Sequence, residues 1–293
     1  MDKPKSITHE HLLSVINTEA RQLFDIKGLR ILDAGCGDGT FLSYMVKALP
    51  SFFPDLSIEA YGFDVFGHGV QEKGFLEEAI RSLSAQVPNT DWRERITSIS
   101  LQDRWPYEDG YFDFIVSNQV IEHVNDHERF FSEIRRTLKD GGCSIHLFPL
   151  KNCILENHLK LPFVHRINNF GFLQNYIRGF SRLNLGKFRS HSKEYGMPLN
   201  EYVERHADYM HYFTNYISYN EVLKLAKKCR LRASFKYTRD LYVRRLRSVL
   251  SLTYKFEYQI RRPSLFDFLF VLFARYISIV TLFLEKRETY RGA

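Results

Sequence analysis

The sequence has 293 residues, of which 44% are hydrophobic, 15% aromatic and 26% charged. This composition predicts a globular chain with a sizeable core, and its ordinary Gly and Pro content excludes a disordered or collagen-like protein. The four cysteines, at positions 36, 143, 153 and 229, form no C-x-x-C pair, which argues against a disulfide framework or a zinc knuckle. The first residues contain no apolar signal segment, so we expect a reduced, cytoplasmic protein.

The positive charge is concentrated late in the chain. Of the formal net charge of +7, residues 227–262 contribute +10, from twelve basic and two acidic residues, and residues 263–293 contribute +1, which leaves −4 for residues 1–226. The overall charge therefore does not imply a basic channel, and we do not expect a nucleic-acid partner.

Predicted helices and strands alternate through the first half of the chain. Alternation at this spacing is typical of a mostly parallel, Rossmann-like α/β sheet with helices on both faces. In such sheets a ligand binds beyond the carboxyl ends of the strands. Helices are predicted at residues 7–26, 40–49, 70–87 and 126–139, and strands at 29–34, 56–63, 96–101, 112–116 and 143–148.

Polar residues stand at the ends of four predicted strands: Asp33, Asp64, Asp103 and Asn118. Because the carboxyl ends of parallel strands meet at one edge of a sheet, we expect these side chains to face a single crevice. Taken alone, Asp64 or Asp103 could equally be a helix cap or a turn residue. Their occurrence in order, at successive strand ends, favours a shared ligand.

The loop after the first strand has the pattern Asp33-x-Gly35-x-Gly37-x-Gly39, which lets a ligand approach the backbone closely. It matches neither the G-x-G-x-x-G of dinucleotide sites nor a phosphate-binding loop, which requires Gly-Lys-Ser/Thr. An acid before the loop suits a cationic ligand better than a phosphate, and Asp64 is placed to accept hydrogen bonds from a ribose diol. A phosphate-free nucleoside with an amino-acid tail fits this pattern.

Four segments resemble the successive motifs of class I S-adenosylmethionine-dependent methyltransferases: ILDAGCGDGTFL (31–42), YGFDV (61–65), residues 101–124 and LKDGGCSIHLF (138–148). The similarity is greatest to the subgroup that includes ubiquinone-biosynthesis O-methyltransferases. It covers about residues 25–150, with a weaker echo at 212–237. It implies a seven-stranded sheet, a methyltransferase activity and S-adenosyl-L-methionine as the cofactor.

The resemblance also implies which residues bind the cofactor. The glycine loop would hold the methionine end, Asp64 the ribose hydroxyls and Asp103 the adenine amino group, with Asn118 beside the sulfonium. The full implied set is Asp33, Gly35, Cys36, Gly37, Gly39, Asp64, Val65, Gln102, Asp103 and Asn118.

The segment Gln119 to His123 borders the predicted crevice, and His123 and Glu122 are the candidate catalytic residues. His123 could take the proton of an acceptor hydroxyl, or both residues could simply cap the next helix. The segment also resembles the E-x-x-E-H of metal-dependent members, including small-RNA 3′-terminal methyltransferases and some ubiquinone-pathway enzymes. Because Gln119 replaces the first Glu, a magnesium site is weakened and no metal is predicted, although His158 and His165 could complete one.

The chain is expected to have four parts: a cofactor-binding core (1–150), a helical aromatic-rich insertion (151–211), the end of the methyltransferase fold (212–240) and a basic, amphipathic helical extension (241–293). The insertion is either a substrate lid or a subdomain with mainly packing duties. Its candidate pocket residues are Phe163, His165, Phe170, Phe172, Tyr176, Phe180, Tyr195, Tyr202, His206, Tyr209, His211 and Tyr212.

Residues 265–284 are strongly apolar, and the spacing of their few polar residues predicts one amphipathic helix. Asp267 and Arg275 argue against a simple transmembrane span. With the basic block beside it, this helix predicts peripheral association of residues 227–287 with an anionic membrane on its cytoplasmic face. Packing on the domain's own core, dimerisation and a transmembrane anchor are the alternatives.

We therefore predict an S-adenosylmethionine-dependent methyltransferase that methylates oxygen on a small-molecule or lipid-linked acceptor. The alternatives are methylation of a glycan sugar or RNA, and a non-catalytic, membrane-tethered module that binds the cofactor. The sequence indicates neither the acceptor's identity nor an oligomeric state.

Overall fold

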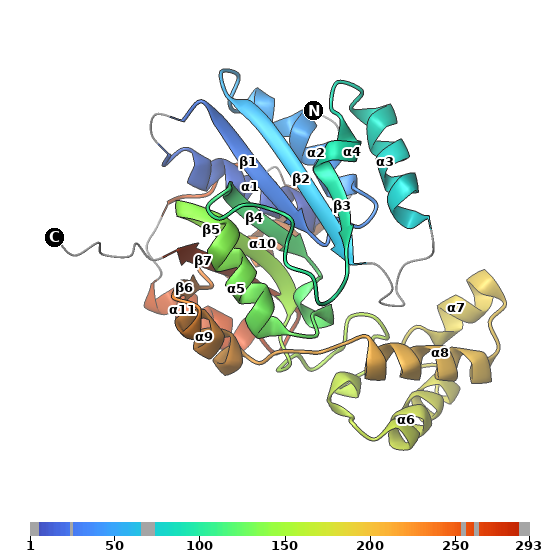
Figure 1. Ribbon diagram of the computed structural model, residues 1–293. Helices are drawn as coiled ribbons and strands as arrows, with labels where there is room; N and C mark the ends of the chain where they lie inside the picture. The colour runs from blue at the N-terminus through green and yellow to red at the C-terminus, as the bar shows by residue number, and fades with distance from the viewer. Residues whose placement is uncertain (1–5, 24–25, 66–73, 253–255, 261–263, 287–293) are drawn as a thin grey trace.

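The computed structural model describes residues 6–23, 26–65, 74–252, 256–260 and 264–286. A seven-stranded sheet runs through the molecule in the order β3-β2-β1-β4-β5-β7-β6 (Figure 1). Only β7 is reversed, because it pairs antiparallel with both β5 and β6 while every other pair is parallel. The strands are β1 (Gly28–Ala34), β2 (Ser57–Val65), β3 (Ile96–Ile99), β4 (Phe112–Asn118), β5 (Leu138–Pro149), β6 (Leu231–Ser234) and β7 (Ile279–Lys286).

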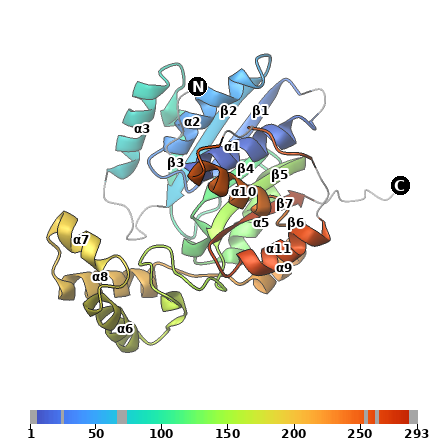
Figure 2. The same ribbon diagram turned by 180° about the vertical axis from the view of Figure 1, so that it is seen from behind.

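Helices cover both faces of the sheet, and each face has its own apolar core (Figures 1 and 2). This layering explains why the central strands are buried on both sides, as parallel strands usually are. On one face lie α1 (Ile7–Ala20), α2 (Thr40–Ala48), α3 (Phe75–Gln86), the short α4 (Trp92–Arg95) and α10 (Thr238–Val249). On the other lie α5 (His127–Thr137), α9 (Tyr219–Lys228) and α11 (Leu265–Ala274).

The predicted order of elements through β5 is confirmed, with shifts at the boundaries. The first helix ends at Ala20, short of the predicted 26. β5 begins at Leu138, so residues 140–142, which separate the predicted helix 126–139 from the predicted strand 143–148, lie inside a strand. Residues 24–25 and 70–73, which were predicted as helix, lie outside the described residues.

The predicted single helix over 265–284 is wrong. α11 ends at Ala274, and residues 279–286 form β7, inserted between β5 and β6. The polar residues of this stretch do fall at helical spacing, but Thr281 is fully buried, with its hydroxyl 2.9 Å from Nε2 of His11. The apolar run Ile279–Leu284 is buried on both faces of the sheet, and this pairing outweighs the helical pattern. The range predicted as an extension thus contains a strand of the main sheet.

Among the described residues, no helix combines the length and hydrophobicity needed to cross a bilayer.

The predicted helical insertion after β5 is confirmed. It stands at one side of the sheet in both views and has an apolar core of its own (Figures 1 and 2). Leu173 and Ile177 pack there against Tyr202, Val203 and Met210. Its helices are α6 (Phe170–Arg182), α7 (Phe188–Tyr195) and α8 (Leu199–Tyr212), preceded by the 3-10 turn η3 (Val164–Arg166).

Candidate active site

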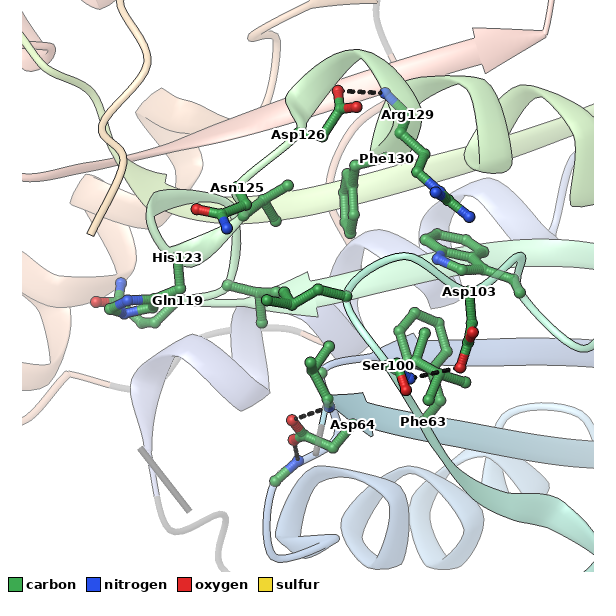
Figure 3. Close-up of a pocket in the computed structure, with 18 of the residues that line it drawn as sticks. Phe63, Asp64, Ser100, Asp103, Gln119, His123, Asn125, Asp126, Arg129 and Phe130 are labelled. Carbon is green, nitrogen blue, oxygen red and sulfur yellow. Dashed lines mark hydrogen bonds between the residues drawn. The ribbon is translucent and has the colours of Figure 1, made fainter. Parts of the chain in front are cut away.

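A cavity of about 410 Å³ opens at the carboxyl ends of the parallel strands (Figure 3). It is where the order of the strands predicts a ligand, since β1 is flanked by β2 on one side and β4 on the other. From the predicted set, the residues that line it are Gly35, Gly37, Asp64, Val65, Asp103, Asn118 and His123.

The glycine loop lies across the end of β2. The amides of Gly35 and Cys36 both donate to the carbonyl of Phe63, at 2.8 and 3.0 Å. Gly35 has φ +81°, and a Cβ at that position would lie 2.5 Å from a methyl group of Val120. Gly37 has φ +52° and no protein atom within 4 Å of where its Cβ would be. The loop therefore requires glycine at 35 for close packing, whereas glycine at 37 leaves space open to the cavity.

Asp64 connects the loop to β2. One carboxylate oxygen accepts from the Gly37 amide at 2.8 Å, and the other accepts from the Val65 amide at 2.7 Å. Figure 3 shows both bonds at the mouth of the loop. Each oxygen retains a second lone pair, so the carboxylate can accept further hydrogen bonds from a ligand diol.

An apolar slot adjoins Asp103. Phe63, Ile99, Trp105 and Phe130 line it, and the rings of Phe63 and Trp105 are 4.8 Å apart. One oxygen of Asp103 accepts from the Ser100 amide at 2.7 Å, so the backbone of the turn fixes the carboxylate at the end of the slot. A flat base with an amino group fits such a slot. These apolar residues were not predicted, because in the sequence they resemble ordinary core residues.

Other predicted cofactor residues support the loop without lining the cavity. Asp33 is buried at the end of β1, where burial, with Asp64 and Asp38 nearby, raises the pKa of its carboxyl well above the usual range. Cys36 packs against Gly62, and Gly39 begins α2 against Leu83. Gln102 offers its backbone carbonyl to Arg129.

The far side of the cavity is formed by the 3-10 turn η2 (Ile121–His123) and by two residues of the insertion, His158 and Tyr209. His123 Nδ1 lies 2.7 Å from the carbonyl of Phe213, a bond that only a protonated Nδ1 can make. In the neutral ring, Nε2 is then the acceptor; it lies 3.4 Å from the Tyr209 hydroxyl.

A buried carboxylate orients His158 in the same way. Glu156 accepts from Nδ1 of His158 at 2.6 Å, from the His158 and Leu159 amides, and from the Tyr216 hydroxyl at 2.8 Å. Burial alone would raise the pKa of Glu156, but its hydrogen bonds and the charge of His158 lower it to about 2. Nδ1 of His158 is thereby fixed as a donor, so in the neutral ring Nε2 is the acceptor.

Glu122, His123 and His158 form a cluster whose potential ligand atoms lie within 4.8 Å of one another. Glu122 is fully buried, and neither of its carboxylate oxygens has a hydrogen-bond partner among the described residues. Burial raises the pKa of Glu122 to about 8. One unpaired carboxylate and two imidazoles held by acceptors at Nδ1 form a donor set that fits a divalent cation.

The cluster shows which of the two histidines that the sequence suggested as further metal ligands, His158 and His165, could bind a metal with Glu122 and His123. His158 joins it, whereas His165 does not: its Nε2 lies 3.1 Å from the carbonyl of Lys151 and its ring packs on Tyr216. Gln119 lines the cavity with a positive φ of 60°, a conformation that non-glycine residues adopt mainly where the surrounding structure imposes it.

The insertion contributes less to the cavity than its composition suggested. Of its candidate aromatic and histidine residues, Tyr209 lines the cavity, while Phe170, Tyr176, Phe180 and Tyr202 pack in or against the insertion's own core. His158, on the loop before η3, lines the cavity as well; the sequence had suggested it only as a metal ligand.

The profile of a family described as a methyltransferase domain matches residues 9–215, well over half of the chain. The chain belongs to this family. The sequence resemblance implies S-adenosylmethionine as the methyl donor of this domain.

Two curated relatives illustrate the similarity. An uncharacterized methyltransferase of Schizosaccharomyces pombe is 28% identical over 48% of this chain and 50% of its own length. A ubiquinone biosynthesis O-methyltransferase of Sinorhizobium fredii is 28% identical over 40% of each chain. The chain thus spans half or less of the length of these relatives.

Among solved structures, an S-adenosylmethionine-dependent methyltransferase of Mesorhizobium loti superposes with a TM-score of 0.48 at 14% identity, over 92% of this chain and 95% of that one.

Proposed function

We propose that this methyltransferase transfers the methyl group of S-adenosylmethionine to an oxygen of a small-molecule or lipid-linked acceptor. The observation that carries the proposal is the position of His123. Its Nε2 is the acceptor nitrogen of a ring that the Phe213 carbonyl orients, and the ring lines the same cavity as the glycine loop and Asp64. A base at this point serves a hydroxyl acceptor, because a hydroxyl must lose its proton as the oxygen attacks.

The glycine loop would hold the amino-acid end of the cofactor, Asp64 its ribose and the slot beside Asp103 its base. The bound cofactor supplies an activated methyl group on sulfur. His123 Nε2 would accept the proton of the acceptor hydroxyl as the carbon–oxygen bond forms and the carbon–sulfur bond of the cofactor breaks, which would leave S-adenosylhomocysteine. The chain's contribution is chiefly to align the two reactants and to exclude water.

The Glu122–His123–His158 cluster permits a second way of activating the hydroxyl. These three residues would hold a divalent cation, which would act as a Lewis acid on the acceptor oxygen. In that case Glu122 would supply the negative charge that Gln119 lacks. Both versions place the acceptor hydroxyl at the same point of the cavity.

The test is cofactor turnover by the full chain against three acceptor classes: soluble hydroxylated metabolites, extracted lipids, and RNA or glycans. The matched control is Gly37→Arg, since a side chain at 37 meets no protein atom near its Cβ and would instead occupy the ligand's space. We expect S-adenosylhomocysteine to form with wild type and a hydroxylated acceptor, and not with the variant.

Turnover with RNA or a glycan alone would replace the proposed acceptor by the corresponding alternative. Bound cofactor without turnover in any class would show a non-catalytic module and refute the proposal. Exhaustive chelation separates the two activation modes, because activity that survives requires no cation, whereas activity lost and restored by added Mg²⁺, Mn²⁺ or Zn²⁺ assigns one to the cluster.

A further inference from the structure

The outward face of α11 is apolar and exposed. Leu265, Leu269 and Phe273 repeat every four residues, and their exposed fractions are 74%, 54% and 65%. The buried residues of this helix are Asp267, Val271 and Ala274, and Val271 packs in the apolar core on that face of the sheet. Five large apolar residues of this ten-residue helix are exposed, far more than its packing on the domain requires.

α10 continues this apolar face. It contacts α11 through the rings of Tyr242 and Phe270, 5.5 Å apart, and through Arg239 and Asp267, 3.7 Å apart. Val243, Leu246 and Val249 follow at intervals of three residues and are exposed, Val249 by 81%. Because positions three and four residues apart share a helix face, these side chains lie on the same side of α10 as its contacts with α11.

The apolar face reaches the edge of the sheet that carries the cavity. β7 begins at Ile279 opposite Pro149, the last residue of β5, so the turn from α11 into β7 lies at the carboxyl end of β5. In that turn the carbonyl of Tyr276 accepts from the Ile154 amide at 2.9 Å. Ile154 and Ile277 are exposed there, and four residues after Ile154 comes His158, which lines the cavity.

Exposed basic residues lie on the helices that carry or adjoin this face. Residues 227–262 contain twelve basic and two acidic residues, and Lys227, Arg230 and Arg247 are among those exposed. Lys227 and Arg230 belong to α9 and its end, and α9 lies beside α11 in both views (Figures 1 and 2). A second copy of the chain would bring the same positive charge to the interface. An anionic bilayer instead complements both the charge and the apolar side chains.

We propose that the α10–α11 surface (Leu246, Val249, Leu265, Leu269, Phe273 and Ile277) docks the protein on an anionic lipid bilayer, with the mouth of the cavity beside the lipid. The apolar side chains enter the interface between head groups and acyl chains, and the basic residues contact the lipid phosphates. A catalytic role of this docking rests on the proposed function, and it would narrow the acceptor class to hydroxyl groups carried by lipids. The docking itself does not depend on turnover.

The test is flotation of the full chain with vesicles of phosphatidylcholine, with and without phosphatidylglycerol, at low and high salt. The variant Leu269→Asp with Phe273→Asp places two charges on the docking face. Its matched control is Leu183→Asp with Tyr195→Asp, two similarly exposed apolar residues of the insertion. Arg247→Glu tests the electrostatic contribution separately. Cofactor binding and thermal unfolding are measured for every variant, so that a folding defect or a failed cofactor site is seen independently.

We expect wild type and the insertion control to float with anionic vesicles. The α11 double variant should bind at least about tenfold more weakly, since it loses two exposed apolar side chains that the bilayer would bury. Arg247→Glu should weaken binding by about tenfold or less and reduce its salt dependence. All variants should bind the cofactor like wild type.

The proposal would be overturned if wild type did not bind anionic vesicles, or if wild type and the double variant bound them equally. A wild-type dimer that the double variant converts to monomer, without vesicle binding, would assign the face to a second copy.

Discussion

The two sides of the cavity are built differently. The cofactor side consists of the glycine loop directly after β1, Asp64 at the carboxyl end of β2, and Asp103 in the turn that follows β3, each fixed by hydrogen bonds to nearby backbone groups. The acceptor side brings together η2, the loop carrying His158 and the helix carrying Tyr209, which are far apart in the sequence. The cofactor side is formed by the ends of sheet strands and the loops that follow them. The acceptor side forms only because the insertion packs against η2.

This difference has a chemical consequence. The cofactor side presents carboxylates whose oxygens are already hydrogen-bonded to the backbone, as suits binding. The acceptor side holds a buried carboxylate without a hydrogen-bond partner among the described residues, and two imidazoles oriented by acceptors at Nδ1. We therefore expect substitutions on the two sides to separate binding from chemistry.

The largest effect is expected for His123→Ala. Loss of the proton acceptor should lower kcat by about 10²- to 10⁴-fold and leave cofactor affinity unchanged. Single-turnover kinetics and calorimetric titration with S-adenosylhomocysteine measure the two quantities. His165→Gln, on the insertion outside the cavity, is the control and should retain activity. An equal loss of cofactor affinity in His123→Ala would show that the two sides are not separable.

Next comes Asp64→Ala, which should weaken cofactor binding by about 10- to 100-fold, because a charged acceptor of two backbone amides and of the ribose diol is removed. Titration of the folded variant with S-adenosylmethionine measures the loss. Asp38→Ala, which removes only an exposed bond to the Thr40 amide, should bind within about threefold of wild type. Wild-type affinity in Asp64→Ala would refute the assignment of the ribose.

Gly35→Ala tests the contact between Gly35 of the glycine loop and Val120, which precedes η2. The new Cβ would meet Val120 at 2.5 Å at a φ of +81°, so we expect a loss of about 1–3 kcal/mol in unfolding free energy, with weaker cofactor binding. Adding Val120→Ala should restore part of the loss. Gly37→Ala, which meets no neighbour, should cost only about 1 kcal/mol. A double variant no better than Gly35→Ala alone would mean that contact with Val120 is unimportant.

The smallest effect at neutral pH is expected at His146, inside the sheet that both sides share. Its ring contacts the hydroxyls of Ser117 and Ser144, and burial lowers its pKa to about 3. The native state then binds fewer protons than the unfolded state, so unfolding free energy should fall as pH drops from about 6.5 towards 3. His146→Gln should make this fall shallower in denaturant titrations across that range. An unchanged slope would contradict a buried neutral imidazole.

Much of the cofactor side could be predicted from sequence. Gly35, Gly37, Asp64 and Asp103 follow strands whose apolar runs are recognisable, and parallel strands bring their carboxyl ends together whatever else the chain does. The apolar slot beside Asp103 could not be predicted, since Trp105 and Phe130 look like ordinary core residues in sequence.

The acceptor side and the C-terminal region depended on long-range packing. His158 meets Glu122 and His123 because the insertion folds back on η2, and no local pattern encodes that contact. Likewise, residues 279–286 have the polar spacing of a helix, yet they form β7, which pairs antiparallel with both β5 and β6.

The sequence by itself determined the α/β alternation, the glycine loop and its acids, and the basic, apolar character of the last quarter, because each is set by residues close together in the chain. Only the tertiary structure decided which histidines share the cavity, that the Glu122 carboxylate is buried without a hydrogen-bond partner among the described residues, and that the tail divides into an exposed helix and a buried strand. Those outcomes depend on contacts between distant segments, where burial and strand pairing outweigh local preference.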